Sequence, residues 1–342
     1  MRIVVIRTSA MGDVALSVPV IQALKNQYPS VETIFVTRKP FNAFFQSING
    51  LTLFNPDFKK RHKGFPGIIR LFRDLNMFGK VDYVIDIHDV LRTKLLRFLF
   101  ILSGTRVKVI DKGRGEKKDL IKGKSKTQLK HTVERYSDVF VSAGLKLRPE
   151  MSKSIFVSQG AEEVAKKLVG DSDVKNIGIA PFAKHQLKMW PEEYLNRLLE
   201  LISANHAVRF WFFGGNEEME KIQSISFRTP GSVNLCGKIS LEEELAVISR
   251  LDLMIAMDSS NMHMASLCGI RVVSIWGGTD PLNGFGAWMQ PPEFSFRIPV
   301  DELTCRPCTV YGKGTCRRGD LACMIWLTPE KVYRKLTDLR LI

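Results

Sequence analysis

The stretch "RTSAMGDVALSVPVIQAL", residues 7–24, follows the apolar segment 3–6 and predicts a strand, a short loop and a helix. A loop in that position is a usual place for phosphate binding. This loop, however, contains one glycine, Gly12, and no lysine, and it matches neither the dinucleotide fingerprint nor the P-loop. Asp13 falls instead in the first turn of the expected helix. The acid either complements the helix dipole or stays ionised and faces a ligand as a general base.

The order of strand and helix repeats along the chain. Strand-like runs in the first half are "RIVVIR", "ETIFVT", "VDYVIDIH" and "RVKVID", and those in the second half are "KNIGIAP", "VRFWFFGG", "LDLMIAMD" and "RVVSIWGG". Alternating elements predict an α/β fold with parallel sheets. We therefore expect two Rossmann-like domains facing one another across a cleft. Their expected bounds are 1–155 and 156–327, followed by a helix at 328–342 that packs back toward the N-terminal domain.

Positive charge is concentrated in one part of this 342-residue chain. The formal net charge is +15, and residues 59–135 hold 21 Lys and Arg against 8 Asp and Glu. Such a localised field attracts a polyanion, which is a nucleic acid, an anionic membrane face or an acidic substrate. A solvated surface is the plain alternative. The residues expected to contact such an anionic partner are Gly12, Lys60, Arg61, Arg92 and Arg114.

The basic helix expected around residues 68–77 carries an apolar stripe that predicts packing on a sheet, with a membrane-surface helix as the alternative. The N-terminus lacks the pattern of a signal peptide, and the most apolar run, 95–102, contains Arg97 and is too short to span a bilayer. We therefore expect a cytoplasmic protein whose six cysteines are thiols or metal ligands.

Polar residues follow several strands of the second half, where ligands of open α/β sheets bind. "MDSSNMH" places Asp258, Ser259 and Ser260 before a helix whose free N–H groups suit a diphosphate, with His263 one turn inside. "GGTDP", residues 277–281, offers close backbone approach and Thr279. Lys188 lies in the loop that also holds Lys184 and His185, and Glu217 follows another strand. Each of these residues has an ordinary surface or turn role as its alternative.

These motifs together resemble the lipopolysaccharide heptosyltransferase family, glycosyltransferase family 9, which has the GT-B fold. The matching segments span nearly the whole chain: "SAMGD" with Pro19, "DIHDVLRT", "HTVERY", "KMWPEEYL" and "MDSSNMHMASLCGIRVVSIWGGTDP". The sequence departs from the family pattern at Asp89 and Ser260, where the family usually has glycine.

The resemblance implies an inverting, metal-independent transfer of a heptose from ADP-heptose to an anionic lipid-A-linked core sugar at the cytoplasmic face of the inner membrane. Asp13 would be the general base and Glu217 would bind the ribose. The other implied contacts to the nucleotide sugar come from Lys188, Asp258, Ser259, Ser260, His263 and Thr279. No cofactor is implied for catalysis, and "DSD" at 171–173 reads as a solvated loop.

Four cysteines near the C-terminus, Cys305, Cys308, Cys316 and Cys323, have the spacing C-x2-C-x7-C-x6-C. Such a set can form a structural zinc site, and free thiols or a redox-sensitive pair are the alternatives.

The nearest rival function is a GT-B transferase that uses a UDP- or GDP-sugar. A basic nucleic-acid-binding protein would explain the charge, but the sequence shows no recognition module for it, so we expect no nucleic-acid partner. A nicotinamide-dependent dehydrogenase lacks its glycine fingerprint.

Overall fold

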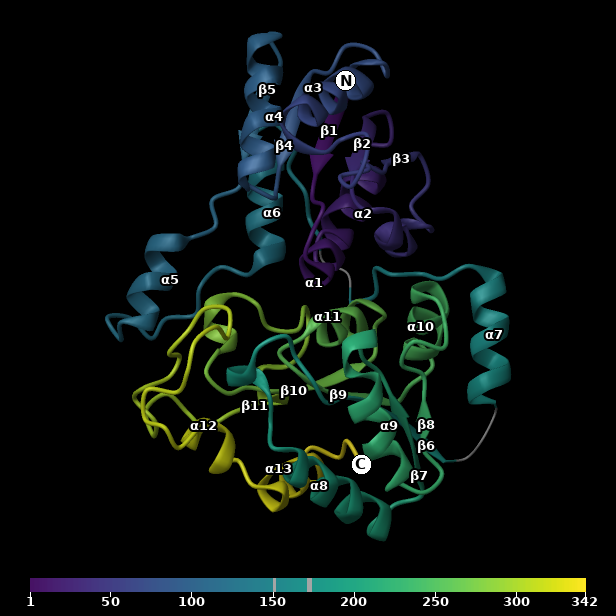
Figure 1. The fold of residues 1–342 in the computed structure, drawn as a ribbon, viewed down its shortest axis with the longest axis vertical. Coiled ribbons are helices and arrows are strands. Elements are labelled where there is room, and N and C mark those ends of the chain that lie inside the picture. The colour runs from purple at the N-terminus through teal and green to yellow at the C-terminus, as the bar shows by residue number, and fades with distance from the viewer. Residues whose placement is uncertain (150–151, 171–173) are drawn as a thin grey trace. The chain divides into compact units, whose positions relative to one another are not determined.

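The computed structural model describes residues 1–149, 152–170 and 174–342. The chain divides into two compact units (Figure 1). The first unit comprises Met1–Lys112 and Thr132–Phe156, and the second comprises Gly113–His131 and Val157–Ile342. The D-x-D at 171–173 lies outside the described residues.

The first unit is built on a parallel five-stranded sheet in the order β3-β2-β1-β4-β5. Its strands are β1 (Arg2–Ile6), β2 (Glu32–Val36), β3 (Leu51–Phe54), β4 (Tyr83–Asp86) and β5 (Arg106–Val109). Its helices are α1 (Met11–Ala15), α2 (Val18–Gln27), α3 (Gly64–Asn76), α4 (Leu91–Leu102), α6 (Thr132–Val141) and the 3-10 segment η1 (Lys39–Phe45).

Helix α3 packs on this sheet, as its apolar stripe predicts. Ile68, Leu71 and Leu75 are buried in one cluster with Val4 of β1 and Ile34 of β2. Burying such side chains stabilises the unit by roughly 1.5–3 kcal/mol each. The stripe therefore belongs to the core and is not a membrane-surface face.

The second unit has a parallel six-stranded sheet in the order β11-β10-β9-β6-β7-β8. Its strands are β6 (Lys175–Ala180), β7 (Val208–Phe212), β8 (Val233–Asn234), β9 (Leu253–Met257), β10 (Arg271–Ile275) and β11 (Ser295–Phe296). Its α-helices are α5 (Arg114–Ile121), α7 (Gln159–Val169), α8 (Glu192–Asn205), α9 (Met219–Phe227), α10 (Leu241–Ile248), α11 (Ser260–Leu267), α12 (Ala322–Ile325) and α13 (Pro329–Asp338). Four 3-10 segments complete it: η2 (Gln186–Lys188), η3 (Asn216–Glu218), η4 (Pro281–Asn283) and η5 (Pro292–Phe294).

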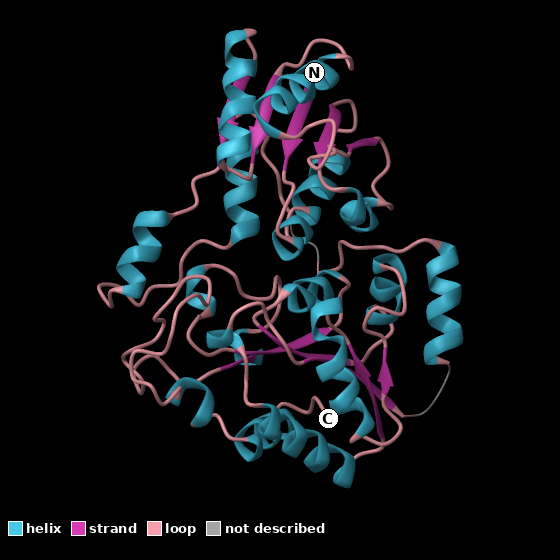
Figure 2. Ribbon diagram, in the orientation of Figure 1, coloured by secondary structure: helices cyan, strands magenta, loops and turns pink. Residues whose placement is uncertain are grey.

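Both sheets have the doubly wound arrangement, with helices and loops around each sheet (Figure 2). Counted from its own first strand, the second unit has the order 6-5-4-1-2-3, which is the Rossmann order. The strand order reverses between β1 and β4 in the first unit and between β6 and β9 in the second. Ligands of such folds bind at these switch points, beyond the carboxyl ends of the strands. The predicted α/β fold with two parallel sheets is confirmed.

Two segments lie elsewhere than the sequence-based boundaries predict. Residues 113–131 belong to the second unit, where the ammonium of Lys117 lies 4.2 Å from the centre of the Phe285 ring and Leu129 N–H donates to the Leu282 carbonyl. The C-terminal helix α13 packs on α8, because Val332 and Leu336 are buried in the second unit's core. Both placements depend on contacts between residues that are far apart in the sequence.

None of the helices described is long and apolar enough to cross a membrane.

Candidate functional site

Asp13 lies at the switch point of the first unit and forms an ion pair there. Its Oδ2 atom is 2.7 Å from Nη2 of Arg7, the residue that directly follows β1. The Arg7 side chain is 8% exposed and that of Asp13 is 32% exposed. A second nitrogen of Arg7 donates to the Ile87 carbonyl beyond β4, at 2.7 Å. The buried guanidinium therefore joins two adjacent strand ends, while the carboxylate stays accessible.

Helix α1 fixes the position of this carboxylate. Asp13 is the third residue of α1, and its Oδ2 also accepts a 3.3 Å hydrogen bond from the backbone N–H of Ala10 at the N-cap. The Tyr136 hydroxyl donates to the Asp13 backbone carbonyl at 3.2 Å. The acid thus complements the helix dipole and faces outward at the same time, so the two sequence-based interpretations do not exclude each other.

His88 completes this cluster, and sequence reasoning did not assign it a role. Its two ring nitrogens lie 3.3 Å from the hydroxyls of Thr8 and Ser9. Burial, with the nearby positive charge of Arg7, lowers the pKa of His88 to about 3. The ring is therefore neutral at physiological pH and acts as a hydrogen-bonding group. Its position two residues past β4, inside "DIHDVLRT", is the sequence signal that could have found it.

The residues expected to contact an acceptor have different environments. Gly12 is buried within α1 and Lys60 is exposed. The Arg92 guanidinium lies 3.8 Å from the centre of the Phe58 ring. Arg61 is bound by Asp74 through two hydrogen bonds of 2.6 and 2.8 Å, and this contact, opposed by partial burial, lowers the pKa of Asp74 to about 2. Arg114 begins α5 in the second unit, so the structure does not bring it together with the others in one unit.

Asp89 shows why the family has a glycine at its position. Its φ angle is 45°, in the left-handed region that glycine adopts most easily. Asp also tolerates this region because its short side chain bonds locally. Here the Asp89 carboxylate accepts a 3.1 Å hydrogen bond from Arg97. An aspartate can therefore replace the glycine without a change in the turn.

The switch point of the second unit holds a polar triad. Lys188 Nζ is 2.8 Å from Oδ2 of Asp258, and the Thr279 hydroxyl donates to the same oxygen at 2.8 Å. Lys188 ends η2 after β6, Asp258 follows β9 directly, and Thr279 follows β10. Three neighbouring strand ends therefore meet, as the sequence predicts for these residues.

The N-terminus of α11 lies in the same turn. Ser259 is its N-cap, but the serine side chain makes no capping bond, and no hydrogen-bond partner of the buried Ser259 hydroxyl lies in the described part of the chain. Ser260 is the first helical residue and is half-buried, while His263 is buried in the first turn. Free backbone N–H groups and an unused hydroxyl at a helix N-terminus are suited to an anion.

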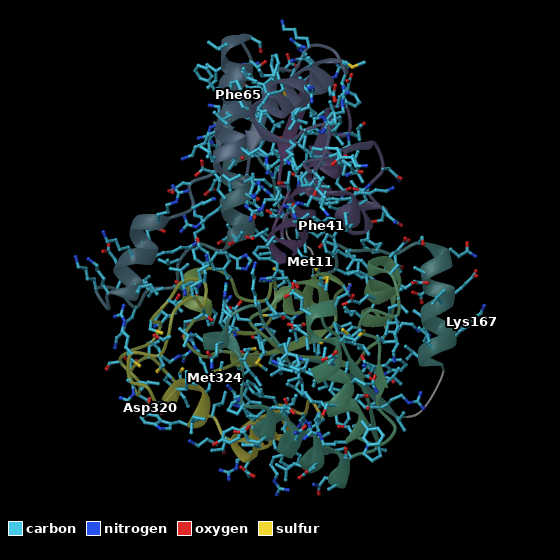
Figure 3. The ribbon with its side chains drawn as sticks, viewed as in Figure 1. Met11, Phe41, Phe65, Lys167, Asp320 and Met324 are labelled. Carbon is cyan, nitrogen blue, oxygen red and sulfur yellow. The ribbon has the colours of Figure 1, made fainter. Side chains whose placement is uncertain are left out.

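The glycines of "GGTDP" make room for protein rather than for a ligand. A Cβ on Gly277 would lie 2.3 Å from Cε of Met324, which Figure 3 labels, and 2.7 Å from the Leu187 carbonyl oxygen. Gly278 N–H donates to that carbonyl at 2.8 Å. The buried Arg306 holds the same loop by donating to the carbonyls of Gly277 and Thr279 at 2.7 and 3.0 Å.

Three further residues near these loops bear on the predicted nucleotide-sugar site. Burial lowers the pKa of His185, and repulsion by Lys188, Lys184 and Lys313 lowers it further. Lys313 is therefore a nearby cation that the sequence did not reveal. Glu217 is exposed on η3 and makes no hydrogen bond or ion pair to another described side chain.

Glu244 is a further acid that sequence reasoning missed. It lies on α10 and accepts a 3.1 Å hydrogen bond from the Asn261 amide of α11. Burial raises the pKa of Glu244 to about 7. A shifted carboxyl group beside α11 is a candidate contact for a ligand.

The four C-terminal cysteines are free thiols that line one cavity. Burial raises the pKa of Cys308, and it raises that of Cys323 to about 11. In the described residues, no three His, Cys, Asp or Glu side chains are arranged to hold a metal ion. The described residues therefore do not show the structural zinc site that the cysteine spacing suggests.

Comparison with known proteins gives a consistent result. The model of "Glycosyltransferase family 9 (heptosyltransferase)" matches residues 68–299. The chain is 24% identical to the "Lipopolysaccharide core heptosyltransferase OpsX" of Haemophilus influenzae over 291 residues, which are 82% of this chain and 80% of that protein.

Solved structures show the same fold. A family 9 glycosyltransferase from Veillonella parvula superposes with a TM-score of 0.77 and 21% identity, over 99% of this chain and 96% of that one. The "ADP-heptose lps heptosyltransferase II" of E. coli superposes with a TM-score of 0.69 and 17% identity, over 99% and 98% of the two chains.

Proposed function

The chain belongs to glycosyltransferase family 9, and from this premise we propose that it moves a heptose from ADP-heptose to an anionic core sugar of lipopolysaccharide, with inversion at the anomeric carbon. The names of its relatives support this choice, since they include lipopolysaccharide heptosyltransferases and an enzyme that uses ADP-heptose. Two observations carry the proposal. An accessible carboxylate lies at the switch point of the first unit, and a helix N-terminus without a side-chain cap lies at that of the second.

The second unit binds the nucleotide sugar in this proposal. The N–H groups of α11, the Ser259 and Ser260 hydroxyls and His263 receive the diphosphate, and Lys188 leaves its ion pair with Asp258 to neutralise it. Thr279 and Asp258 shape the pocket, and Glu217 binds the ribose. Fixed positive groups stabilise the charge that develops on the departing ADP. The protein therefore supplies from its own residues the charge that a metal ion provides in other transferases.

Asp13 is the general base in this proposal. Its carboxylate takes the proton of the acceptor hydroxyl while that oxygen attacks the anomeric carbon, and the bond to ADP breaks on the opposite face, which inverts the configuration. The Arg7 guanidinium, 2.7 Å away, holds this carboxylate in place. Neutral His88 holds the hydroxyls of Thr8 and Ser9 beside it.

The acceptor contacts are assigned to Gly12, Lys60, Arg61, Arg92 and Arg114. Arg92 keeps one face of its guanidinium on Phe58, which leaves its edge for a carboxylate or phosphate. Arg61 is partly neutralised by Asp74 and contributes less.

We further propose that the protein works at the cytoplasmic face of the inner membrane. One helix supports this: α4 exposes Leu91, Phe98, Ile101 and Leu102 by 75, 56, 55 and 69%. Large exposed apolar side chains in a strongly basic region suit an anionic lipid surface. Phe98→Ser with Ile101→Ser should reduce sedimentation with phosphatidylglycerol vesicles. Phe227→Ser, which changes an 87% exposed residue of the second unit, should leave it unchanged.

The rival donors are separated by one experiment. Thermal denaturation with ADP-, UDP- and GDP-sugars should give the largest rise in Tm with the ADP-sugar, because a ligand stabilises the state that binds it. A larger rise with a UDP- or GDP-sugar would favour the other GT-B transferase. Salt-sensitive RNA binding, with no rise in Tm for any of the three nucleotide sugars, would favour a nucleic-acid-binding protein.

A further inference from the structure

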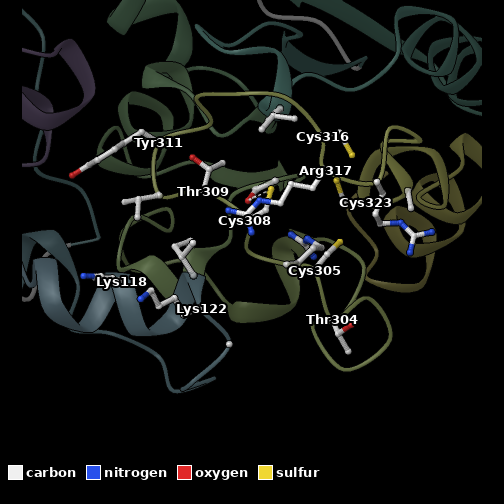
Figure 4. Close-up of a pocket in the computed structure, with 18 of the residues that line it drawn as sticks. Lys118, Lys122, Thr304, Cys305, Cys308, Thr309, Tyr311, Cys316, Arg317 and Cys323 are labelled. Atoms are coloured by element: carbon white, nitrogen blue, oxygen red, sulfur yellow. Dashed lines mark hydrogen bonds between the residues drawn. The ribbon is translucent and has the colours of Figure 1, made fainter.

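The cavity beside the cysteines is lined by cations. It has a volume of about 990 Å³, and its wall combines α5, the loop around residues 304–311, the turn 316–318 and the start of α12. Figure 4 shows Lys118 and Lys122 on one helix, across from Cys305, Cys308 and Arg317. The basic side chains of the lining are Lys118, Lys122, Lys124, Arg306, Arg317 and Arg318, and no Asp or Glu lies among the lining residues.

Two of these cations form ion pairs with carboxylates that do not line the cavity. Arg306 pairs with Asp280 at 3.3 Å, and Arg318 pairs with Asp320 at 2.8 Å. No described carboxylate pairs with the side chains of the remaining four, which are Lys118, Lys122, Lys124 and Arg317. Lys118 lies on α5 and Lys122, four residues later, is the C-cap of this helix, a spacing at which like charges repel. The free protein therefore bears an unfavourable concentration of charge that a bound anion would relieve.

Specific contacts hold these charged residues together in the second unit. The segment 113–131 leaves the first unit and lies on the second, where Lys117 packs on Phe285 and the Gln128 side chain donates to the Pro281 carbonyl at 3.0 Å. Lys126 also pairs with Asp301. These anchors hold α5 and its C-cap so that Lys118, Ile121 and Lys122 line the same cavity as the cysteines.

The rest of the lining suits a phosphate group. Thr304 and Thr309 also line the cavity, and threonine hydroxyls can donate hydrogen bonds to phosphate oxygens. Gly278 and Leu187 form another part of the wall, and they belong to the loops that hold Thr279 and Lys188. An occupant would contact the back of the nucleotide loops without using the nucleotide-binding residues.

We propose that this cavity is a second anion site, distinct from the sugar-nucleotide site, and that it binds a multiply charged phosphate group. The group is either free, as a phosphate or pyrophosphate ion, or the head of a phosphorylated lipid. The site does not depend on the proposed transferase activity, because its binding is measured directly.

The test uses the full chain in a Lys188→Ala background, which weakens any phosphate binding at the nucleotide loops. Inorganic pyrophosphate is titrated by calorimetry, and vesicles of phosphatidylcholine with phosphatidic acid are tested by sedimentation. The cavity variant is Lys118→Gln, Lys122→Gln and Arg317→Gln, all exposed positions. The matched control removes the same charge elsewhere in the second unit, through Lys166→Gln, Lys167→Gln (on α7, Figure 3) and Arg334→Gln.

The cavity variant should bind pyrophosphate or the phosphatidic acid vesicles at least tenfold more weakly than the control, at equal Tm. Loss in the pyrophosphate arm identifies a free ion, and loss confined to the vesicle arm identifies a lipid headgroup. Equal binding by the cavity variant and the control in both arms, or no binding by the Lys188→Ala protein in either, would overturn the proposal. Failure to bind ADP in the unaltered protein would instead count against the transferase function alone.

Discussion

The Lys188 ammonium lies 2.8 Å from the Asp258 carboxylate, so the cation that we propose as a diphosphate contact is held by an acid of the same unit. Asp258 also receives the Thr279 hydroxyl at 2.8 Å, which ties the loops after β6, β9 and β10 together. In the proposed function, a nucleotide that binds at α11 therefore competes with Asp258 for Lys188. The ion pair keeps the cation in place without leaving a buried charge uncompensated.

Replacing Lys188 with alanine should weaken ADP binding ten- to a hundredfold, since a hydrogen bond to a charged group contributes about 1.5–3 kcal/mol. His263→Ala should weaken it as well, by a smaller factor. Calorimetric titration with ADP measures both effects, and Lys167→Ala on α7 is the control. Unchanged affinity in both variants would refute the assignment of the diphosphate to this switch point.

Asp13→Asn should lower kcat by roughly 10²–10⁴-fold, the usual loss when a general base is removed. The amide keeps the shape of the side chain and can still accept a hydrogen bond from Arg7. ADP affinity should therefore remain that of the unaltered enzyme. Turnover at the normal rate would remove Asp13 from the mechanism.

The pKa of Glu244 makes stability depend on pH. Because burial raises this pKa to about 7, the folded protein favours the protonated acid. Its stabilising effect is complete below the ordinary pKa of glutamate and is lost as the pH rises through 7. Glu244→Gln keeps the acceptor for Asn261 and cannot ionise. The variant should exceed the unaltered protein in Tm at pH 8, by an amount equivalent to about 1–3 kcal/mol, and should match it near pH 4. An equal difference in Tm at both pH values would contradict the shift.

Gly277→Ala should destabilise the second unit by about 1–3 kcal/mol, the usual cost of forcing an atom into a packed region. The new methyl group would meet Met324 and the Leu187 carbonyl. Gly160→Ala on α7, whose Cβ meets no atom within 4 Å, is the control. Urea denaturation compares the two, and equal midpoints would show that the loop yields without cost.

The cysteine cluster should contain no stoichiometric zinc, and chelators should leave Tm unchanged, because the thiols do not form a ligand set. Elemental analysis of protein purified without chelator measures the metal. One zinc ion per chain, lost together with stability on chelation, would restore the structural zinc hypothesis.

The sequence predicts the parts of this protein that depend on local pattern. Asp13, Asp258 and Thr279 could be found because each follows a buried apolar run, and parallel strands bring such positions to one edge. The sequence pattern does not reveal the strands β3, β8 and β11, and β8 and β11 have only two residues each, too few to show a periodicity. The neutral state of His88 follows from burial and from the charge of Arg7. Only the folded structure brings these two causes together, so the sequence does not reveal this state.

Long-range contacts account for the other differences. The chain sequence gives no sign that residues 113–131 leave the first unit, since their basic pattern would suit any surface. The glycines of "GGTDP" were interpreted as room for a ligand, whereas Leu187 and Met324 occupy that space.

The excursion of residues 113–131 gives the polypeptide three crossings between its units, at 112–113, 131–132 and 156–157. A single cut or a single recombination breakpoint therefore cannot separate the two halves cleanly. A chimera joined near residue 156 would combine the second sheet of one parent with the α5 of another. Engineers who exchange donor specificity between such enzymes would need to graft two separate stretches of chain.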